Sequence, residues 1–370
     1  MSYYDIYLKY KGLPFDNIFS GISLNDAKAA IKSDRRNEEG LLALLSPAAG
    51  NYLEDMAREA HNLTLRHFGK TIQLYTPMYL SNYCDNECSY CGFNHNNEVS
   101  RRKLSLEEVE KEAGAISSTG LEHILILTGE SQDMSPLSYI KDCIKILKRY
   151  FSSISIEIYA LTESEYSELI GEGVDNLTLY QETYDERVYG LVHKGGPKKD
   201  YLFRLCAPER AAKQGIRSVN VGVLLGLNDW RREVFFMGLH AKYLQDNFCG
   251  VEIGASIPRL RAHLGDFKIP SEISDRNMAQ IITALRIFLP RLGISLSTRE
   301  SPELREGLLP LGVTRISAGS STRVGGHAVA CDESFNLPQF EISDKRNVEE
   351  IKTMLALKGY QPVLKDWMLI

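Results

Sequence analysis

Three of the seven cysteines of this chain fall within eight residues, at Cys84, Cys88 and Cys91. The other four are scattered singly, which favours small buried side chains in a reducing compartment over a disulfide framework. Thiolates are soft ligands that suit zinc or an iron–sulfur cluster. A short loop that delivers three sulfurs to one site constrains the fold more than any other feature of the sequence.

The chain from Thr71 onward alternates short β-rich runs with helical patterns. Most of the runs are nearly continuous in apolar residues, which predicts parallel strands covered on both faces. Capping boxes at Ser105–Glu108 and Thr162–Glu165 mark helix starts, and Gly120 and Gly173 stand where a left-handed residue ends a helix. The strands are expected at residues 72–80, 123–127, 154–160, 177–180, 218–225, 251–255, 294–297 and 314–317.

Eight strand–helix units predict an α/β fold, a closed or partly closed (β/α)8 TIM-type barrel of parallel strands. Residues 1–70 are expected to form an N-terminal helical extension, 71–334 the barrel, and 335–370 a C-terminal helix and tail packed on the barrel. Polar residues or glycine follow every expected strand. In a barrel these ends converge on one face, where catalytic sites are built, and the cysteine loop follows the first strand. The basic turn at 194–199 is expected to be a solvated loop.

Composition excludes several classes of function. The net charge of −5 argues against general nucleic-acid binding, which relies on neutralising phosphates. No run approaches the roughly 20 apolar residues of a membrane span, and the first residues carry no secretion signal. We therefore expect a cytoplasmic enzyme without a nucleic-acid or membrane partner.

Two metal centres fit the cysteine loop. His95 adds a fourth donor at the spacing Cys84-x3-Cys88-x2-Cys91-x3-His95, which would suit structural zinc. A cubane iron–sulfur cluster also needs four ligands, so three cysteines would leave one iron open to a small molecule. The position of the loop on the expected active face favours the iron–sulfur cluster.

The spacing CxxxCxxC after the first strand, with Tyr90 before the last cysteine, resembles the radical S-adenosylmethionine (SAM) enzymes. In that family the cysteines hold a [4Fe-4S] cluster whose remaining iron is chelated by SAM. Further motifs resemble the aromatic amino acid lyases of this family, above all the tyrosine lyases of thiamine biosynthesis. These motifs are Leu44–Ala49, Cys91–Phe93, Leu127–Glu130, Tyr180–Tyr184, Pro258–Arg261, Ser297–Ser301 and Ser317–Gly326, and they span nearly the whole chain.

A related tyrosine lyase, of [FeFe]-hydrogenase maturation, carries further cysteines for a second cluster in a C-terminal extension. No cysteine follows Cys331 here, which favours the thiamine branch. The chain departs from the lyases at two points. His327 stands where they usually have a tyrosine, and the sequence stops three residues after Trp367, which bears on any lid that the tail forms.

The resemblance implies a reaction. A reduced cluster splits SAM into methionine and a 5′-deoxyadenosyl radical, which takes a hydrogen from the amino group of L-tyrosine. The Cα–Cβ bond then breaks and gives 2-iminoacetate and p-cresol. Flavodoxin or ferredoxin would supply the electron, and a thiazole synthase would receive the imine. Another aromatic amino acid, such as tryptophan, stays open as the substrate.

SAM carries an ammonium and a carboxylate, and the strand ends offer partners for both. Thr128, Gly129 and Glu130 are assigned to the ammonium, with Glu182 as a second candidate. Arg204 is assigned to the carboxylate, since a guanidinium can bind it with two hydrogen bonds. The alternative is that Glu182 and Arg204 form a structural ion pair.

The remaining assignments concern the ribose, the cluster and the substrate. Glu157 is expected to bind the ribose hydroxyls, with Tyr159 beside it, unless Glu157 is a solvated strand end. Tyr90 is expected next to the cluster and SAM. Arg299 is expected to bind the carboxylate of tyrosine, with Ser317 as a hydrogen-bond partner. Weaker candidates are Tyr90 or Tyr83 for the phenol and Ser320 and Arg323 for the substrate. Arg259 and Arg261 would neutralise local anions or lie at the surface.

Overall fold

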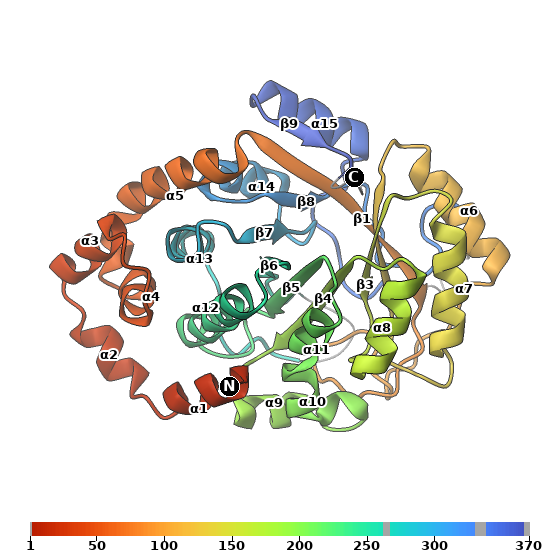
Figure 1. The fold of residues 1–370 in the computed structure, drawn as a ribbon, viewed down its shortest axis with the longest axis horizontal. Helices are drawn as coiled ribbons and strands as arrows, with labels where there is room; N and C mark the ends of the chain where they lie inside the picture. The colour runs from red at the N-terminus through yellow and green to blue at the C-terminus, as the bar shows by residue number, and fades with distance from the viewer. Residues whose placement is uncertain (1, 262–266, 330–337, 366–370) are drawn as a thin grey trace.

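The computed structural model describes residues 2–261, 267–329 and 338–365. Eight parallel strands close into a barrel, because β1 pairs with β2 on one side and with β8 on the other (Figure 1). This confirms the predicted (β/α)8 TIM-type fold. The strands are β1 (Thr71–Ser81), β2 (His123–Thr128), β3 (Ser153–Glu157), β4 (Asn176–Glu182), β5 (Ser218–Val223), β6 (Glu252–Ser256), β7 (Gly293–Leu296) and β8 (Arg315–Ser317).

Helices cover the outside of the barrel. The side chains of Ser105 and Thr162 accept hydrogen bonds from the third residue of their helices, so both predicted capping boxes are present. None of the helices in the described ranges is long and apolar enough to cross a membrane. The helices between the strands are α6 (Leu106–Ser117), α7 (Leu137–Leu147), α8 (Glu163–Glu172), α9 (Glu186–Val192), α10 (Tyr201–Leu205), α11 (Ala207–Lys213), α12 (Trp230–Asn247), α13 (Asp275–Phe288) and α14 (Pro302–Leu308).

The N-terminal helices wrap around the side of the barrel that α12 and α13 cover (Figure 1). The hydroxyl of Tyr3 donates to the carbonyl of Phe236 at 2.7 Å. The amide of Gln280 donates to the carbonyls of Leu44 at 3.0 Å and Ser46 at 2.8 Å. These helices are α1 (Tyr3–Tyr10), α2 (Phe15–Gly21), α3 (Leu24–Lys32), α4 (Glu38–Leu45) and α5 (Leu53–Phe68).

The C-terminal part adds α15 (Val348–Leu357) and a short ninth strand, β9 (Gln361–Val363), which the sequence analysis did not predict. This strand pairs in parallel with residues Thr71–Gln73 of β1, whereas β8 pairs with β1 only from Gln73 onward. The first residues of β1 are therefore not paired with β8, and β9 pairs with them instead. The tail after residue 365, including Trp367, lies outside the described residues.

The strands are parallel and buried on both faces, as expected, but the inner face of the barrel around a small cavity is mostly polar. Residues that alternate along the strands face a small internal cavity. They are mostly polar, and His123 links two strands through contacts of 2.8 Å with Gln73 and 2.7 Å with Ser155. The apolar residues between them, such as Ile124 and Ile126, belong to the core under the helices. The third strand is also shorter than expected, since its pairing ends at Glu157.

A buried ion pair holds the segment after residue 337 against the barrel. Asp344 is fully buried and contacts the guanidinium of Arg305, which is 1% exposed. Backbone N–H groups of Ser343 and Asp344 donate to the carbonyl of Thr298 at 2.9 and 3.2 Å. This segment brings Gln339 to the carboxyl-terminal face of the barrel, where Gln339 N–H donates to the carbonyl of Thr322 at 3.0 Å.

Replacing Asp344 with asparagine should leave the Arg305 guanidinium buried without a counter-charge. We expect the free energy of unfolding to fall by about 3–5 kcal/mol, the usual effect of removing one partner of a buried pair. Denaturant unfolding of the apoprotein measures it. Asp142→Asn is the matched control, because Asp142 pairs with Lys145 on the surface. Equal effects of the two substitutions would contradict the role of Asp344.

Candidate functional site

The cysteine loop follows β1 and is held by its own backbone. Cys91 N–H donates to the carbonyl of Cys88 at 3.2 Å, and the Asn94 side chain donates to the same carbonyl at 2.9 Å. The backbone N–H of Asp85 donates to the carbonyl of Glu130 at 3.1 Å, which ties the loop to the end of β2. A Cβ atom at Gly92 would lie 2.7 Å from the carbonyl oxygen of Gln339, so the closely packed 338–347 segment requires glycine there.

The three cysteines line one cavity at the carboxyl ends of the strands. It contains about 930 Å³ of space not filled by atoms, part of it open to solvent. Its lining includes most of the residues that the sequence analysis assigned to the site: Cys84, Cys88, Tyr90, Cys91, Thr128, Gly129, Glu130, Glu157, Glu182, Arg204 and Arg299. These side chains come from the ends of β1, β2, β3, β4 and β7 and from α10.

The thiols fit a cluster ligated by three cysteines. Burial raises the pKa of Cys84 to about 11 and also raises the pKa values of Cys88 and Cys91, so the sulfurs carry protons until a metal displaces them. His95, the fourth ligand of the zinc interpretation, is exposed and does not line the cavity, and its Nδ1 lies 3.3 Å from the carbonyl oxygen of Cys84. The side chain of Gln339 donates to the Cys91 sulfur at 3.8 Å. Three sulfurs facing a cavity leave the fourth corner of a cubane cluster open to a small ligand.

Four charged side chains form a buried group beside the cysteines, which we call the charge quartet: Glu130, Glu182, Lys198 and Arg204. Arg204 Nη1 lies 2.8 Å from Glu130, and its Nη2 lies 3.6 Å from Glu182. Lys198 Nζ lies 2.6 Å from Glu182 and 3.9 Å from Glu130. Burial alone would raise the pKa of Glu130, but the charges of Arg204 and Lys198 outweigh it and hold the pKa below its usual value. The formal charges of the two carboxylates and the two cations balance within this group.

Lys198 corrects the sequence analysis, which placed residues 194–199 in a solvated loop. Its side chain is only 9% exposed. The loop can approach because of its glycines, since a Cβ at Gly196 would lie 2.4 Å from Oδ1 of Asn86. That oxygen accepts the Lys198 backbone N–H at 2.8 Å. The glycine pair before Lys198 is the signal that the sequence analysis missed.

Glu182 has an unusual backbone conformation. The pairing of β4 with β5 shifts register between Tyr180 and Glu182, and Glu182 has a φ of +70°. It is the one non-glycine residue with positive φ in the described ranges. Such a conformation costs of order 1–3 kcal/mol and persists where the surrounding contacts hold it, commonly at functional sites. Here its contacts with Lys198 and Arg204 point its carboxylate into the cavity.

Glu157 and Arg299 line another part of the cavity. Burial, and then the charge of Glu182, raise the pKa of Glu157 to about 7, so Glu157 is not the solvated strand end of the alternative interpretation. Arg299 is partly buried, and the loss of hydration lowers its pKa. Its guanidinium centre lies 3.3 Å from the ring centroid of Phe340. Within the described part of the chain the guanidinium makes no hydrogen bond or ion pair, so its N–H groups are available to donate to the carboxylate of a ligand.

Tyr90 is fixed by a neighbouring histidine. Its hydroxyl lies 2.8 Å from Nε2 of His193, whose Nδ1 lies 3.0 Å from the carbonyl oxygen of Tyr189. The carbonyl can only accept, so Nδ1 carries the proton and the Tyr90 hydroxyl donates to Nε2. Burial, and then the charges of Lys198 and Arg204, lower the pKa of His193 to about 2, which keeps the imidazole neutral.

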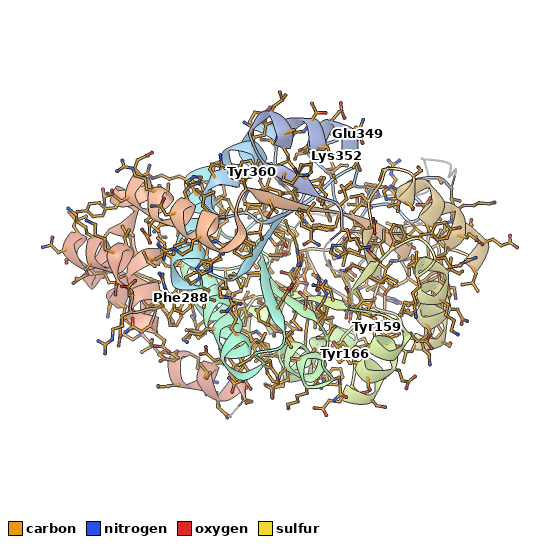
Figure 2. The ribbon with its side chains drawn as sticks, turned by 45° about the horizontal axis from the view of Figure 1, so that its top comes forward. Tyr159, Tyr166, Phe288, Glu349, Lys352 and Tyr360 are labelled. Atoms are coloured by element: carbon orange, nitrogen blue, oxygen red, sulfur yellow. The ribbon has the colours of Figure 1, made fainter. Side chains whose placement is uncertain are left out.

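The structure leaves some predicted residues outside the cavity. Tyr159 lies on the α8 side of the barrel (Figure 2), and its hydroxyl donates to the carbonyl of Ser135 at 2.9 Å. The hydroxyl of Ser317 accepts the backbone N–H of Thr298 at 3.1 Å. Ser320 and Arg323 line a second cavity, which shares Phe340 with the first. Of the remaining weaker candidates, Tyr83 does not line the cavity that contains the cysteines, whereas Arg261 does. Arg259 and Arg261 both contact Glu300.

His327, the departure from the family pattern, also lies away from the cysteines. Its backbone N–H donates to the buried carboxylate of Glu112 at 2.9 Å, and its Nε2 lies 3.1 Å from the carbonyl oxygen of Pro77. It belongs to the lining of the second cavity. His327 therefore does not belong to the lining of the cavity that contains the cysteines.

Comparison with known proteins agrees with this arrangement. Residues 78–237 match the radical SAM superfamily, and residues 256–361 match the Biotin and Thiamin Synthesis associated domain. The chain is 38% identical to the 2-iminoacetate synthase of Escherichia coli and 37% identical to that of Salmonella typhimurium, over 97% of this chain and 96% of each relative.

Solved structures are similar as well. A crystal structure of HydG, a maturase of the [FeFe]-hydrogenase, has a TM-score of 0.86 and 34% identity, over 98% of this chain and 79% of the HydG chain. Methylornithine synthase (PylB) shares the fold at a TM-score of 0.70 and 21% identity, over 94% of this chain and 97% of that chain.

The burial of Lys198 generates a prediction. Lys198→Met should weaken SAM binding by about tenfold or more, because a hydrogen-bonded charge contributes about 1.5–3 kcal/mol and Glu182 would lose its closest cation. Equilibrium dialysis of labelled SAM with cluster-loaded protein measures the affinity. Lys194→Met is the control, because Lys194 is exposed on the same loop. If both substitutions leave SAM affinity unchanged, Lys198 has no part in the site.

Proposed function

This chain belongs to the 2-iminoacetate synthase family of radical SAM enzymes, and we propose that it cleaves the Cα–Cβ bond of L-tyrosine to 2-iminoacetate and p-cresol. The family membership makes it a lyase that uses a [4Fe-4S] cluster and SAM. The observation that carries the proposal is the 38% identity to a 2-iminoacetate synthase along nearly the whole of both chains. The zinc interpretation has no support from this family.

The balance of atoms and electrons in the proposed reaction shows how many electrons and protons the site must receive. The bound cluster supplies the electron that divides SAM into methionine and a 5′-deoxyadenosyl radical, the species that takes the hydrogen from the tyrosine amino group. Loss of 2-iminoacetate leaves a hydroxybenzyl radical, which needs one further electron and one proton to become p-cresol. Each turnover thus consumes two electrons and one proton.

The charge quartet is suited to the amino acid part of SAM. Glu130 and Glu182 offer carboxylates to the ammonium, and Arg204 and Lys198 offer cations to the carboxylate, at the side of the cavity that the cysteines line. Because both signs are already present and balanced, a zwitterion can bind without leaving a buried charge unpaired. The predicted ion pair of Glu182 and Arg204 and the predicted contacts with SAM are therefore compatible roles of the same residues.

Arg299 is suited to the carboxylate of tyrosine. A partly buried guanidinium that forms no ion pair within the described residues is costly, and a substrate carboxylate would reduce this cost by accepting two hydrogen bonds from it. Glu157, with a pKa of about 7, can accept or donate a hydrogen bond at neutral pH and is assigned to the ribose hydroxyls. Ser317 stays assigned to the substrate only through the backbone that its hydroxyl holds, that of Thr298 next to Arg299.

The physiological setting is part of the proposal. The proposed product, 2-iminoacetate, is an imine that hydrolyses readily. Direct transfer to a thiazole synthase for thiamine biosynthesis would protect it. A flavodoxin or ferredoxin would supply electrons in the cytoplasm. Support comes from the relatives named 2-iminoacetate synthase and from the match to a domain associated with biotin and thiamin synthesis.

The experiment is anaerobic incubation of cluster-loaded protein with dithionite, SAM and each aromatic amino acid. We expect about four irons per chain and release of p-cresol from tyrosine, measured by chromatography. Cys88→Ala is the control, because without this ligand neither p-cresol nor 5′-deoxyadenosine should form. Cleavage of tryptophan with no p-cresol from tyrosine would contradict the proposed substrate.

The role of Arg299 can be tested separately. Arg299→Lys keeps the positive charge but loses the planar fork, so the KM for tyrosine should rise by about tenfold or more. Slow cleavage of SAM without p-cresol should continue, since the charge quartet is intact. Arg323→Ala is the control, because Arg323 lines the second cavity. An unchanged KM in Arg299→Lys would remove Arg299 from the substrate site.

A further inference from the structure

The two electrons of the proposed reaction come from outside this chain and arrive one at a time. A donor protein must therefore bring its redox centre close to the cysteine loop. Electron-transfer partners usually bind through small, transient interfaces guided by opposite charges. The surface over the cysteine loop is the place to look for such an interface.

One segment, residues 192–196, covers the cysteine loop directly. Ser89 N–H donates to the carbonyl of Val192 at 2.9 Å, and Glu87 N–H donates to the carbonyl of Gly195 at 3.0 Å. Cys88 forms an antiparallel bridge with His193. The segment 192–196, which includes the exposed residue Lys194, therefore packs directly against the backbone of Cys88.

This segment continues into α9 and α10, which lie together at the lower edge of Figure 1. Tyr189 of α9 packs edge-on against Tyr201 of α10, with ring centroids 5.0 Å apart. Three of the exposed large apolar side chains of the molecule lie here, although this stretch is short. They are Leu191, which is 59% exposed, Leu202 and Phe203.

Exposed cations surround these apolar side chains. Arg187, Lys194 and Lys199 are all exposed, and in the described ranges none of them forms an ion pair with a carboxylate. The chain as a whole has a net charge of −5, so this concentration of positive charge is a local feature. We call the six residues Arg187, Leu191, Lys194, Lys199, Leu202 and Phe203 the α9–α10 surface.

The other exposed side of the cysteine loop is different. Its exposed charged residues include Asp85 and Glu98, and none of the exposed large apolar side chains of the described residues falls between residues 85 and 100. An acidic partner would be repelled there and attracted to the α9–α10 surface. Of these two surfaces, the α9–α10 surface is the one with charge complementarity to an acidic protein.

We propose that the α9–α10 surface is the docking site of an acidic one-electron donor protein of the flavodoxin class. The proposal rests on the proposed function, because it assumes a reaction that draws external electrons. Each docking event oxidises one anionic flavin hydroquinone to the neutral semiquinone, and the released electron enters the protein at the cysteine loop. No proton moves in this step, and two successive events supply one turnover.

The test compares two reductants in the full-length, cluster-loaded protein. The test variant is Lys194→Glu/Lys199→Glu, and the matched control is Lys28→Glu/Lys111→Glu, which makes the same change of charge at exposed positions of α3 and α6. Dithionite is small and needs no docking site. We expect all proteins to release p-cresol at the same rate with dithionite.

With a reduced flavodoxin as the donor, the test variant should show a KM for flavodoxin raised by about tenfold. The wild type and the control variant should keep their KM. Binding of oxidised flavodoxin, measured by calorimetry, should weaken by a similar factor in the test variant alone. Leu191→Ser should weaken this binding without a change of charge.

The outcomes separate the two proposals. If tyrosine is not the substrate, p-cresol is absent with either reductant. Cleavage of SAM to 5′-deoxyadenosine still measures electron delivery in that case, so the docking proposal is tested by this product. Unchanged flavodoxin affinity and KM in the test variant would overturn the docking proposal. A loss of self-association on gel filtration, with flavodoxin binding unchanged, would instead assign the surface to a second copy of this chain.

Discussion

Compensation of buried charge is the constraint on which the site depends. Two carboxylates and two cations lie within one cavity next to three thiols, and each ion is acceptable there only because an opposite charge is within a few ångströms. Several distant parts of the chain must meet for this. Glu130 comes from the end of β2, Glu182 from a bulge in β4, Lys198 from a glycine-rich loop and Arg204 from α10. Closure of the barrel brings these four segments to one end.

The charged groups that line one part of the cavity are paired with one another, and the charged group in another part is not. The charge quartet is paired within the protein, whereas Arg299 forms no ion pair within the described residues and contacts the ring of Phe340. This difference gives the two ligands of the proposed reaction separate places. A zwitterionic cosubstrate fits the paired groups, and a substrate carboxylate would pair with the unpaired one. The segment anchored by Asp344 supplies Phe340 against Arg299, so the C-terminal part of the chain contributes to the substrate side.

The same loop connects the site to the surface. Residues 192–196 form hydrogen bonds with the cysteine loop on their inner side, and Lys198 a few residues later reaches Glu182. The outer side of this region carries the α9–α10 surface. Charge therefore has two separate roles within a short stretch of sequence. In the two proposals, the buried cations would bind the cosubstrate and the exposed cations would bind a donor protein.

The sequence by itself determined the barrel, the cysteine loop and most of the cavity lining. These depend on local patterns: the alternation of strands and helices, the capping residues of α6 and α8, and the spacing of Cys84, Cys88 and Cys91. Only the tertiary structure decided the burial of Lys198, the lack of an ion pair at Arg299 within the described residues, the polar inner face of the barrel and the pairing of β9. The physical reason is that each of these depends on contacts between residues far apart in the chain. The sequence of a strand alone does not determine which of its faces lies inside the barrel. The residues next to a lysine in sequence do not show that a carboxylate from another strand will pair with it.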